Sequence, residues 1–212
     1  MRKLFRRILL LATLAFVAWY LWTNSQHNTT IARAIAHHLP PTANISCGTK
    51  CGTERWRIKT LSDADRDLVN ADPVTATVES LAALPRPGVI PENSRVLPVE
   101  GTVYTVTGYV GAWKNETDRD IHIVLSGMVN ERMSIIAEIP NAECAGACYS
   151  GLAEAYAQAR STFLRRINRR NPRDEPIVLT ITGVGFFDRP HGQLGAALNN
   201  FELHPVLKIE AR

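Results

Sequence analysis

The chain has 212 residues, of which 45% are apolar and 21% are charged. This apolar content is enough to build a folded core, so the composition excludes a disordered, collagen-like or low-complexity chain. The formal net charge of +4 raises the question of a nucleic-acid or membrane partner, which depends on where the charge lies.

The excess positive charge is confined to the N-terminus. Arg2, Lys3, Arg6 and Arg7 lie within the first seven residues, and residues 1–26 contain no acidic residue. The rest of the chain carries 20 basic and 20 acidic residues. A protein that binds nucleic acid without sequence preference needs a surplus of basic groups. The charge balance therefore does not support a nucleic-acid partner.

An apolar run over residues 8–22 follows these cations directly. Cations followed by an apolar segment are typical of a signal peptide or of a signal anchor. We expect residues 1–26 to form a transmembrane anchor, and a cleaved signal peptide is the alternative. Cations kept in the cytoplasm predict a single-pass protein whose globular part is periplasmic or otherwise extracytoplasmic. The membrane is then its first partner.

Between this segment and residue 100 the pattern is irregular. Residues 27–46 are polar and predict a linker. Residues 47–100 predict an irregular arm, in which apolar and basic residues alternate over 54–60 and indicate a short strand. Thr75 is placed to cap a short helix over residues 76–84.

The region 101–212 shows regular alternation. It predicts strands at 102–113, 120–126, 133–139, 177–187 and 201–209, and an amphipathic helix at 151–169. The fold class is therefore mostly β with one main helix. The order β-β-β-α-β-β predicts a five-stranded OB-like Greek-key barrel, and an α+β sandwich with the same element order is the alternative.

Two C-terminal motifs carry a resemblance. They are ITGVGFFDRPHGQLG at 181–195 and ELHPVLKI at 202–209. With these and shorter matches at 55–60, 120–125 and 136–140, the chain resembles a family of exported bacterial proteins of unassigned function. The resemblance spans about residues 47–209, and it implies an exported barrel without assigning an activity. Family members usually carry Pro and Gly where this chain has Leu198 and Asn200.

The four cysteines form two C-x3-C pairs, Cys47 with Cys51 and Cys144 with Cys148. Four thiolates could hold zinc, but in an exported protein they more often form disulfides. We expect disulfides and no structural metal, and the sequence does not choose among the three possible connectivities.

Carboxylates and imidazoles gather on the predicted barrel strands and on the loop before the last strand. If the faces that carry them converge, they could perform acid–base chemistry or bind a divalent metal. The candidate catalytic residues are Asp120, His122, Glu138, Asp188 and His191. The candidate ligand-binding residues are Glu202, His204, Phe187 and Gln193.

No nucleophile elbow, zincin, P-loop or dinucleotide motif is present. The sequence thus favours an exported, membrane-tethered, OB-like binding module of unknown ligand that is not an enzyme and needs no cofactor. The alternative is a metal-assisted hydrolase, such as a phosphodiesterase or nuclease, which would need a divalent metal. Convergence of the Asp, His and Glu candidates in one cleft would favour the enzyme.

Overall fold

The computed structural model describes residues 47–168, 176–190 and 192–211. The predicted anchor at 1–26 and the linker at 27–46 lie outside the described residues. Within those ranges, no helix combines the length and apolar character that crossing a bilayer requires.

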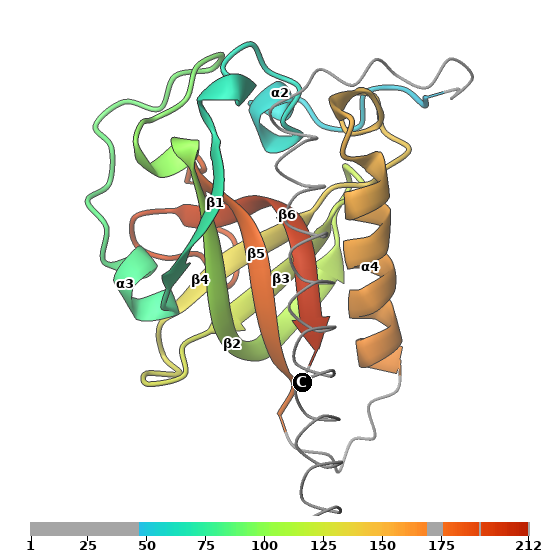
Figure 1. Cartoon of the computed structure of the whole chain (residues 1–212). Helices are drawn as coiled ribbons and strands as arrows, with labels where there is room; N and C mark the ends of the chain where they lie inside the picture. Colours follow the sequence, from blue (N-terminus) through green and yellow to red (C-terminus); the bar gives the residue numbers. More distant parts are fainter. Residues whose placement is uncertain (1–46, 169–175, 191, 212) are drawn as a thin grey trace, which may run out of the picture.

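A closed five-stranded β-barrel forms the centre of the molecule (Figure 1). Its strands follow the order β2-β3-β4-β6-β5, and β5 pairs again with β2 to close the sheet. Neighbours are antiparallel except β4 and β6, which are parallel. The predicted mostly-β barrel is confirmed. The strands are β2 (Thr102–Asn115), β3 (Ile121–Ser126), β4 (Ser134–Ile139), β5 (Val178–Phe187) and β6 (Phe201–Ala211).

Alternation along the strands separates an apolar interior from a second, outer face. On β3, Ile121, Ile123 and Leu125 enter the main core, and on β4, Ile135 and Ala137 join them. Side chains at the intervening positions point away from this core because successive residues in a strand face opposite sides. The outer face of β3, β4 and β6 carries the polar candidates.

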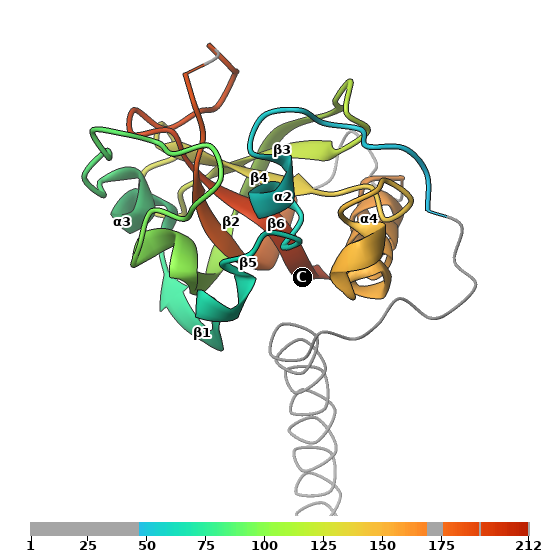
Figure 2. The ribbon, with the colours of Figure 1, turned by 90° about the horizontal axis from the view of Figure 1, so that it is seen from above.

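Helix α4 (Ala153–Asn168) packs along β6. The predicted stripe is confirmed: Tyr156, Ala159 and Phe163 are buried, and Ile167 packs against the main core. Helices α3 (Val78–Ala82) and α4 lie at opposite sides of the barrel in both views (Figure 2). The helix at 151–169 was predictable because its apolar spacing was regular.

The prediction of a strand at 54–60 is wrong. This segment forms a one-turn helix, α2 (Trp56–Lys59), after Arg55 in the left-handed region. Two of its three basic side chains are buried: Arg55 is 1% exposed and Lys59 9%, whereas Arg57 is exposed. The alternation of apolar and basic residues in this segment therefore does not mark a strand. It belongs to a short helical turn, in which polar side chains with buried partners stand next to apolar ones.

The rest of the arm adds short elements around the barrel. A strand that the sequence did not predict, β1 (Asn70–Ala76), pairs in parallel with β2. Helix α3 is capped by Thr77 rather than Thr75, because Thr77 and Ser80 form a reciprocal capping box. Three short 3-10 turns complete the described elements: η1 (Arg66–Leu68), η2 (Val99–Gly101) and η3 (Cys148–Ser150).

A buried ion pair fixes the arm to the barrel. The guanidinium of Arg55 donates two hydrogen bonds to Glu100, of 2.7 and 2.8 Å, and one of 2.9 Å to the carbonyl of Phe187 on β5. The Glu100 carboxylate in turn accepts from the Phe187 amide at 2.8 Å. The charges of both residues are thus satisfied away from water.

Two disulfides join the arm to the segment before α4. Cys47 bonds to Cys148 and Cys51 bonds to Cys144, so each bridge links the two C-x3-C pairs. The expectation of disulfides is confirmed, with the crossing connectivity. Two disulfides are typical of an oxidising, extracytoplasmic compartment.

Candidate functional site

A row of polar side chains crosses the outer face of the barrel. His122 on β3 lies directly opposite Glu138 on β4. Strands β4 and β6 are parallel, and Ile136 on β4 pairs with Glu202 on β6. Two residues later on each strand, and on the same face, Glu138 therefore lies beside His204. The convergence considered from the sequence therefore occurs, on the outer face of the sheet and not in the barrel interior.

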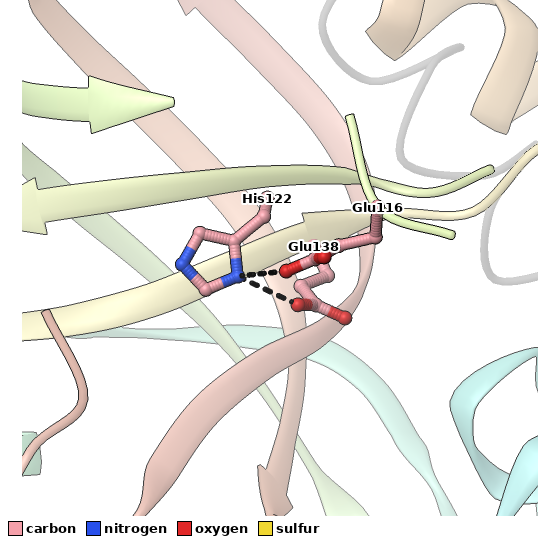
Figure 3. A group of neighbouring side chains, drawn as sticks. All are labelled: Glu116, His122 and Glu138. Carbon is pink, nitrogen blue, oxygen red and sulfur yellow. Dashed lines mark hydrogen bonds and ion pairs between the residues drawn. The ribbon is translucent and has the colours of Figure 1, made fainter. Parts of the chain in front are cut away.

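The Glu138 carboxylate joins the two histidines of this row. Its Oε1 lies 2.9 Å from Nδ1 of His122 and its Oε2 lies 3.1 Å from Nδ1 of His204. Glu116, in the turn between β2 and β3, approaches the same His122 nitrogen at 3.4 Å. Figure 3 shows the two carboxylates converging on that one ring nitrogen.

The loop between β5 and β6 covers His122 from the other side. Nε2 of His122 lies 3.4 Å from the Leu194 carbonyl, so both ring nitrogens face oxygen acceptors. With its N–H on Nε2, directed at this carbonyl, His122 would present Nδ1 to the two carboxylates as the nitrogen that can bind a metal ion.

Behind Glu138 the cluster is fully buried. Nε2 of His204 lies 3.3 Å from Oδ2 of Asp120, and its Nδ1 lies 4.0 Å from Oε2 of Glu202. The other oxygen of Asp120 accepts from the Asn141 amide at 3.0 Å. These contacts hold the His204 ring between carboxyl groups on two sides.

The electrostatics of the cluster follow from burial and mutual contact. Burial would lower the pKa of His204, but its contacts with Asp120 and Glu138 raise that pKa to about 9. Burial would raise the pKa of Glu138, but the two histidines outweigh it and lower that pKa. Burial, with the neighbouring Glu138 and Asp188 carboxylates, raises the pKa of Glu202 well above its ordinary value. At neutral pH the cluster therefore holds a cationic His204 and an anionic Glu138.

A cleft of about 330 Å³ opens beside this cluster. It lies between the turn that joins β2 to β3, the loop that follows β5, and the arm around α2. Among the described residues that line it, five are acidic and one is basic. The acidic residues are Glu54, Glu116, Asp118, Glu138 and Asp188, and the basic residue is Lys59.

Lys59 lies inside this cleft, with Nζ 3.6 Å from Oδ2 of Asp188. Burial would lower the pKa of Lys59, but the carboxylates of Asp188, Glu202 and Glu138 raise it. The ammonium also lies 5.4 Å from the centre of the Phe186 ring. Lys59 is therefore charged and offsets part of the negative charge.

The structure places seven of the nine sequence candidates in two neighbouring groups. Asp120, His122, Glu138, Glu202 and His204 form one cluster, and Asp188 and Gln193 line the cleft beside it. Phe187 lies in the barrel core, against Phe201. His191 lies outside the described residues.

Four charged residues of the cleft were missed from the sequence: Glu54, Lys59, Glu116 and Asp118. Glu54 and Lys59 fall in the segment 54–60 that the sequence predicts as a strand, and no local pattern marks either as a site residue. Glu116 and Asp118 fall in a charged turn between the first two barrel strands. OB barrels bind their ligands at two loops, and this loop is one of them. The position of Glu116 and Asp118 in a predicted OB barrel was therefore the signal that could have identified them.

Among the described residues, two sets of side chains present metal-ligand atoms within 4.8 Å of one another. One set is Glu116, His122 and Glu138, and the other is Asp120, Glu138 and His204. The first reaches the cleft through Glu116 and Glu138, whereas the second is buried. Imidazole nitrogen and carboxylate oxygen are common ligands of transition metals.

Comparison of the chain with protein-family models, with curated proteins and with solved structures found no match. Function is therefore inferred from the residues of the site themselves.

Proposed function

We propose that the protein is an exported, membrane-tethered binding module that holds a positively charged ligand in the acidic cleft. One observation carries the proposal: the described lining of the cleft has five carboxylates and one lysine. A concave surface of one sign concentrates ligands of the opposite sign. A cation fits this cleft, and a phosphate-rich ligand does not.

The position of the cleft supports the same conclusion. OB barrels bind ligands on the face of their second and third strands, flanked by the loop between strands one and two and the loop between strands four and five. Here those strands are β3 and β4, and those loops supply Glu116 and Asp188. The cleft thus lies where a barrel of this order offers a ligand-binding face.

Location outside the cytoplasm is supported by the two disulfides, by the N-terminal cations before an apolar run, and by the resemblance to exported proteins. Mass spectrometry of the mature protein tests the tether. An intact N-terminus supports an anchor, and a mature chain beginning near residue 26 contradicts it.

Titration calorimetry of the oxidised full chain with spermidine, a soluble polycation, tests the binding proposal. We expect saturable binding that weakens at least threefold in Asp118→Asn and in Glu116→Gln, because each removes one charge from the cleft wall. Glu131→Gln, at an exposed position on the turn after β3, is the matched control and should bind as the parent does. Binding of an oligophosphate in preference to spermidine would contradict the proposal.

A hydrolase is the second candidate, favoured by the contacts among His122, Glu138 and Glu116. These side chains could hold a metal that activates water. Hydrolysis of bis(p-nitrophenyl) phosphate by the full chain with added Mn²⁺ or Zn²⁺, lost in Asp188→Ala, would support it. A metal-loaded protein without hydrolysis would leave the binding module as the function.

A further inference from the structure

We propose that Glu116, His122 and Glu138 bind one divalent transition-metal ion of the zinc type at the inner end of the cleft. This inference rests on the proposed function, because it names the cation that the cleft takes. Zinc is held in proteins by imidazole nitrogen and carboxylate oxygen, often with an open position for water or a ligand. Calcium instead takes six to eight oxygen ligands, and this site has two carboxylates and an imidazole.

The donor atoms are spaced as ligands around a single ion. Nδ1 of His122 lies 2.9 Å from Oε1 of Glu138 and 3.4 Å from Oε1 of Glu116. Metal–ligand bonds of about 2.0–2.1 Å separate neighbouring ligand atoms by about 2.9 Å at right angles and about 3.4 Å at tetrahedral angles. The two observed separations fall in this range, and all three ligand atoms lie within 4.8 Å of one another.

The residues behind the site hold two of the ligands in orientation. The second ring nitrogen of His122 faces the Leu194 carbonyl, and the second oxygen of Glu138 contacts His204, which in turn contacts Asp120. Metal-binding histidines usually donate their other N–H to a carbonyl or carboxylate, and ligating carboxylates are themselves hydrogen-bonded. The row across β3, β4 and β6 supplies both kinds of support.

The Glu116 carboxylate already has a cation beside it. Its Oε1 is shielded from solvent, and Nζ of Lys114 lies 2.8 Å from it. This oxygen therefore suits a cationic partner, and a bound metal ion would take the place of the ammonium contact.

The ion has a route to the site from solvent. Glu116 and Glu138 both line the cleft, and Glu116 is 21% exposed. Asp118 and Asp188 add negative charge along that route. The far side of the site is closed by the loop after β5.

Calorimetric titration of the full, oxidised chain with ZnCl₂ after dialysis against a chelator tests the site. We expect one Zn²⁺ per chain, at least tenfold weaker binding in His122→Ala and in Glu116→Gln, and little competition from excess Mg²⁺ or Ca²⁺. Glu116→Gln tests the site even if His122→Ala fails to fold, because Glu116 lies in a partly exposed turn. Glu131→Gln is the matched control, since it removes a charge from an exposed position on the turn after β3 and outside the cleft, and Zn²⁺ binding should change less than twofold.

The outcomes separate this inference from the proposed function. Zn²⁺ binding that depends on Glu116 and His122 supports both. Cleft-dependent binding of spermidine without Zn²⁺ binding overturns the metal site and leaves the cationic-ligand module intact. Zn²⁺ binding that is unchanged in Glu116→Gln also overturns the metal site. If neither Zn²⁺ nor spermidine binds, both are wrong.

Discussion

Nδ1 of His122 lies 2.9 Å from Oε1 of Glu138, directly across two antiparallel strands. The alternation that sends Ile121 and Ile123 into the core turns His122 outward, where the loop after β5 covers it. The barrel therefore carries a buried polar layer outside its apolar core. An acidic cleft gives solvent access to one edge of that layer.

The ion pair between Arg55 and Glu100 should be a main determinant of stability. Arg55→Ala leaves the Glu100 carboxylate buried without its partner, and we expect a loss of about 3–5 kcal/mol in the free energy of unfolding. Urea unfolding followed by circular dichroism measures this. Arg57→Ala, exposed on the same turn, should change stability by less than about 0.5 kcal/mol. A loss below about 1 kcal/mol in Arg55→Ala would show that the pair does not fix the arm.

Removing both disulfides should cost more than twice the stability that removing either one costs. They close loops of 101 and 93 residues in separation, but each shortens the loop that the other closes to about ten residues. In the chain-entropy model, removing either pair by Cys→Ser should cost about 3 kcal/mol and removing both about 7 kcal/mol.

Urea unfolding of the Cys51→Ser/Cys144→Ser variant, the Cys47→Ser/Cys148→Ser variant and the quadruple variant measures these costs. Equal costs for two and for four substitutions would contradict this account. Loss of spermidine binding in the first variant is also expected, because Cys51 lines the cleft.

The Glu79 carboxylate should stabilise the turn after β3 in a pH-dependent way. Oε1 of Glu79 accepts from the amides of Val129 and Asn130 at 3.0 and 2.9 Å. Slight burial would raise the pKa of Glu79, but these hydrogen bonds outweigh it and lower that pKa. A lowered folded-state pKa gives stability that is present above the unfolded pKa and lost as pH falls through the folded value.

We therefore expect Glu79→Gln to cost about 0.5–1 kcal/mol at pH 7, after allowance for solvent screening. The difference should shrink as the pH falls from 7 to about 3, through the ordinary carboxyl range. Parallel urea unfolding of both proteins at the two pH values measures it. A difference that grows on acidification would refute the role of the charge.

Substitutions at two glycines of the loop after β5 distinguish the cost of backbone strain from the cost of a steric clash. Gly192 and Gly195 both have positive φ, but a Cβ at Gly192 would meet nothing within 4 Å, whereas one at Gly195 would lie 2.5 Å from the Val124 side chain. Gly192→Ala should cost about 1–2 kcal/mol for the backbone conformation alone. Gly195→Ala should cost more, and should weaken ligand binding by lifting the loop from His122. Equal costs in thermal unfolding would show that the loop does not press on β3.

The barrel was predictable from the sequence because its strands alternate and its long helix keeps a regular apolar stripe. The shared faces of Asp120 with His122 and of Glu202 with His204 followed from the same period of two. Their meeting with Glu138 was not predictable, since it depends on strand register across β3, β4 and β6. The strand β1 was missed because five of its seven residues are exposed, which removes the alternation that marks a strand.

Anomalous X-ray diffraction from crystals of the protein grown with Zn²⁺ tests the central claim, a cation bound in the acidic cleft, most directly. The account predicts one strong anomalous peak in contact with His122 Nδ1 and with carboxylate oxygens of Glu116 and Glu138. Peaks confined to carboxylates outside the cleft, with none beside His122, would contradict it.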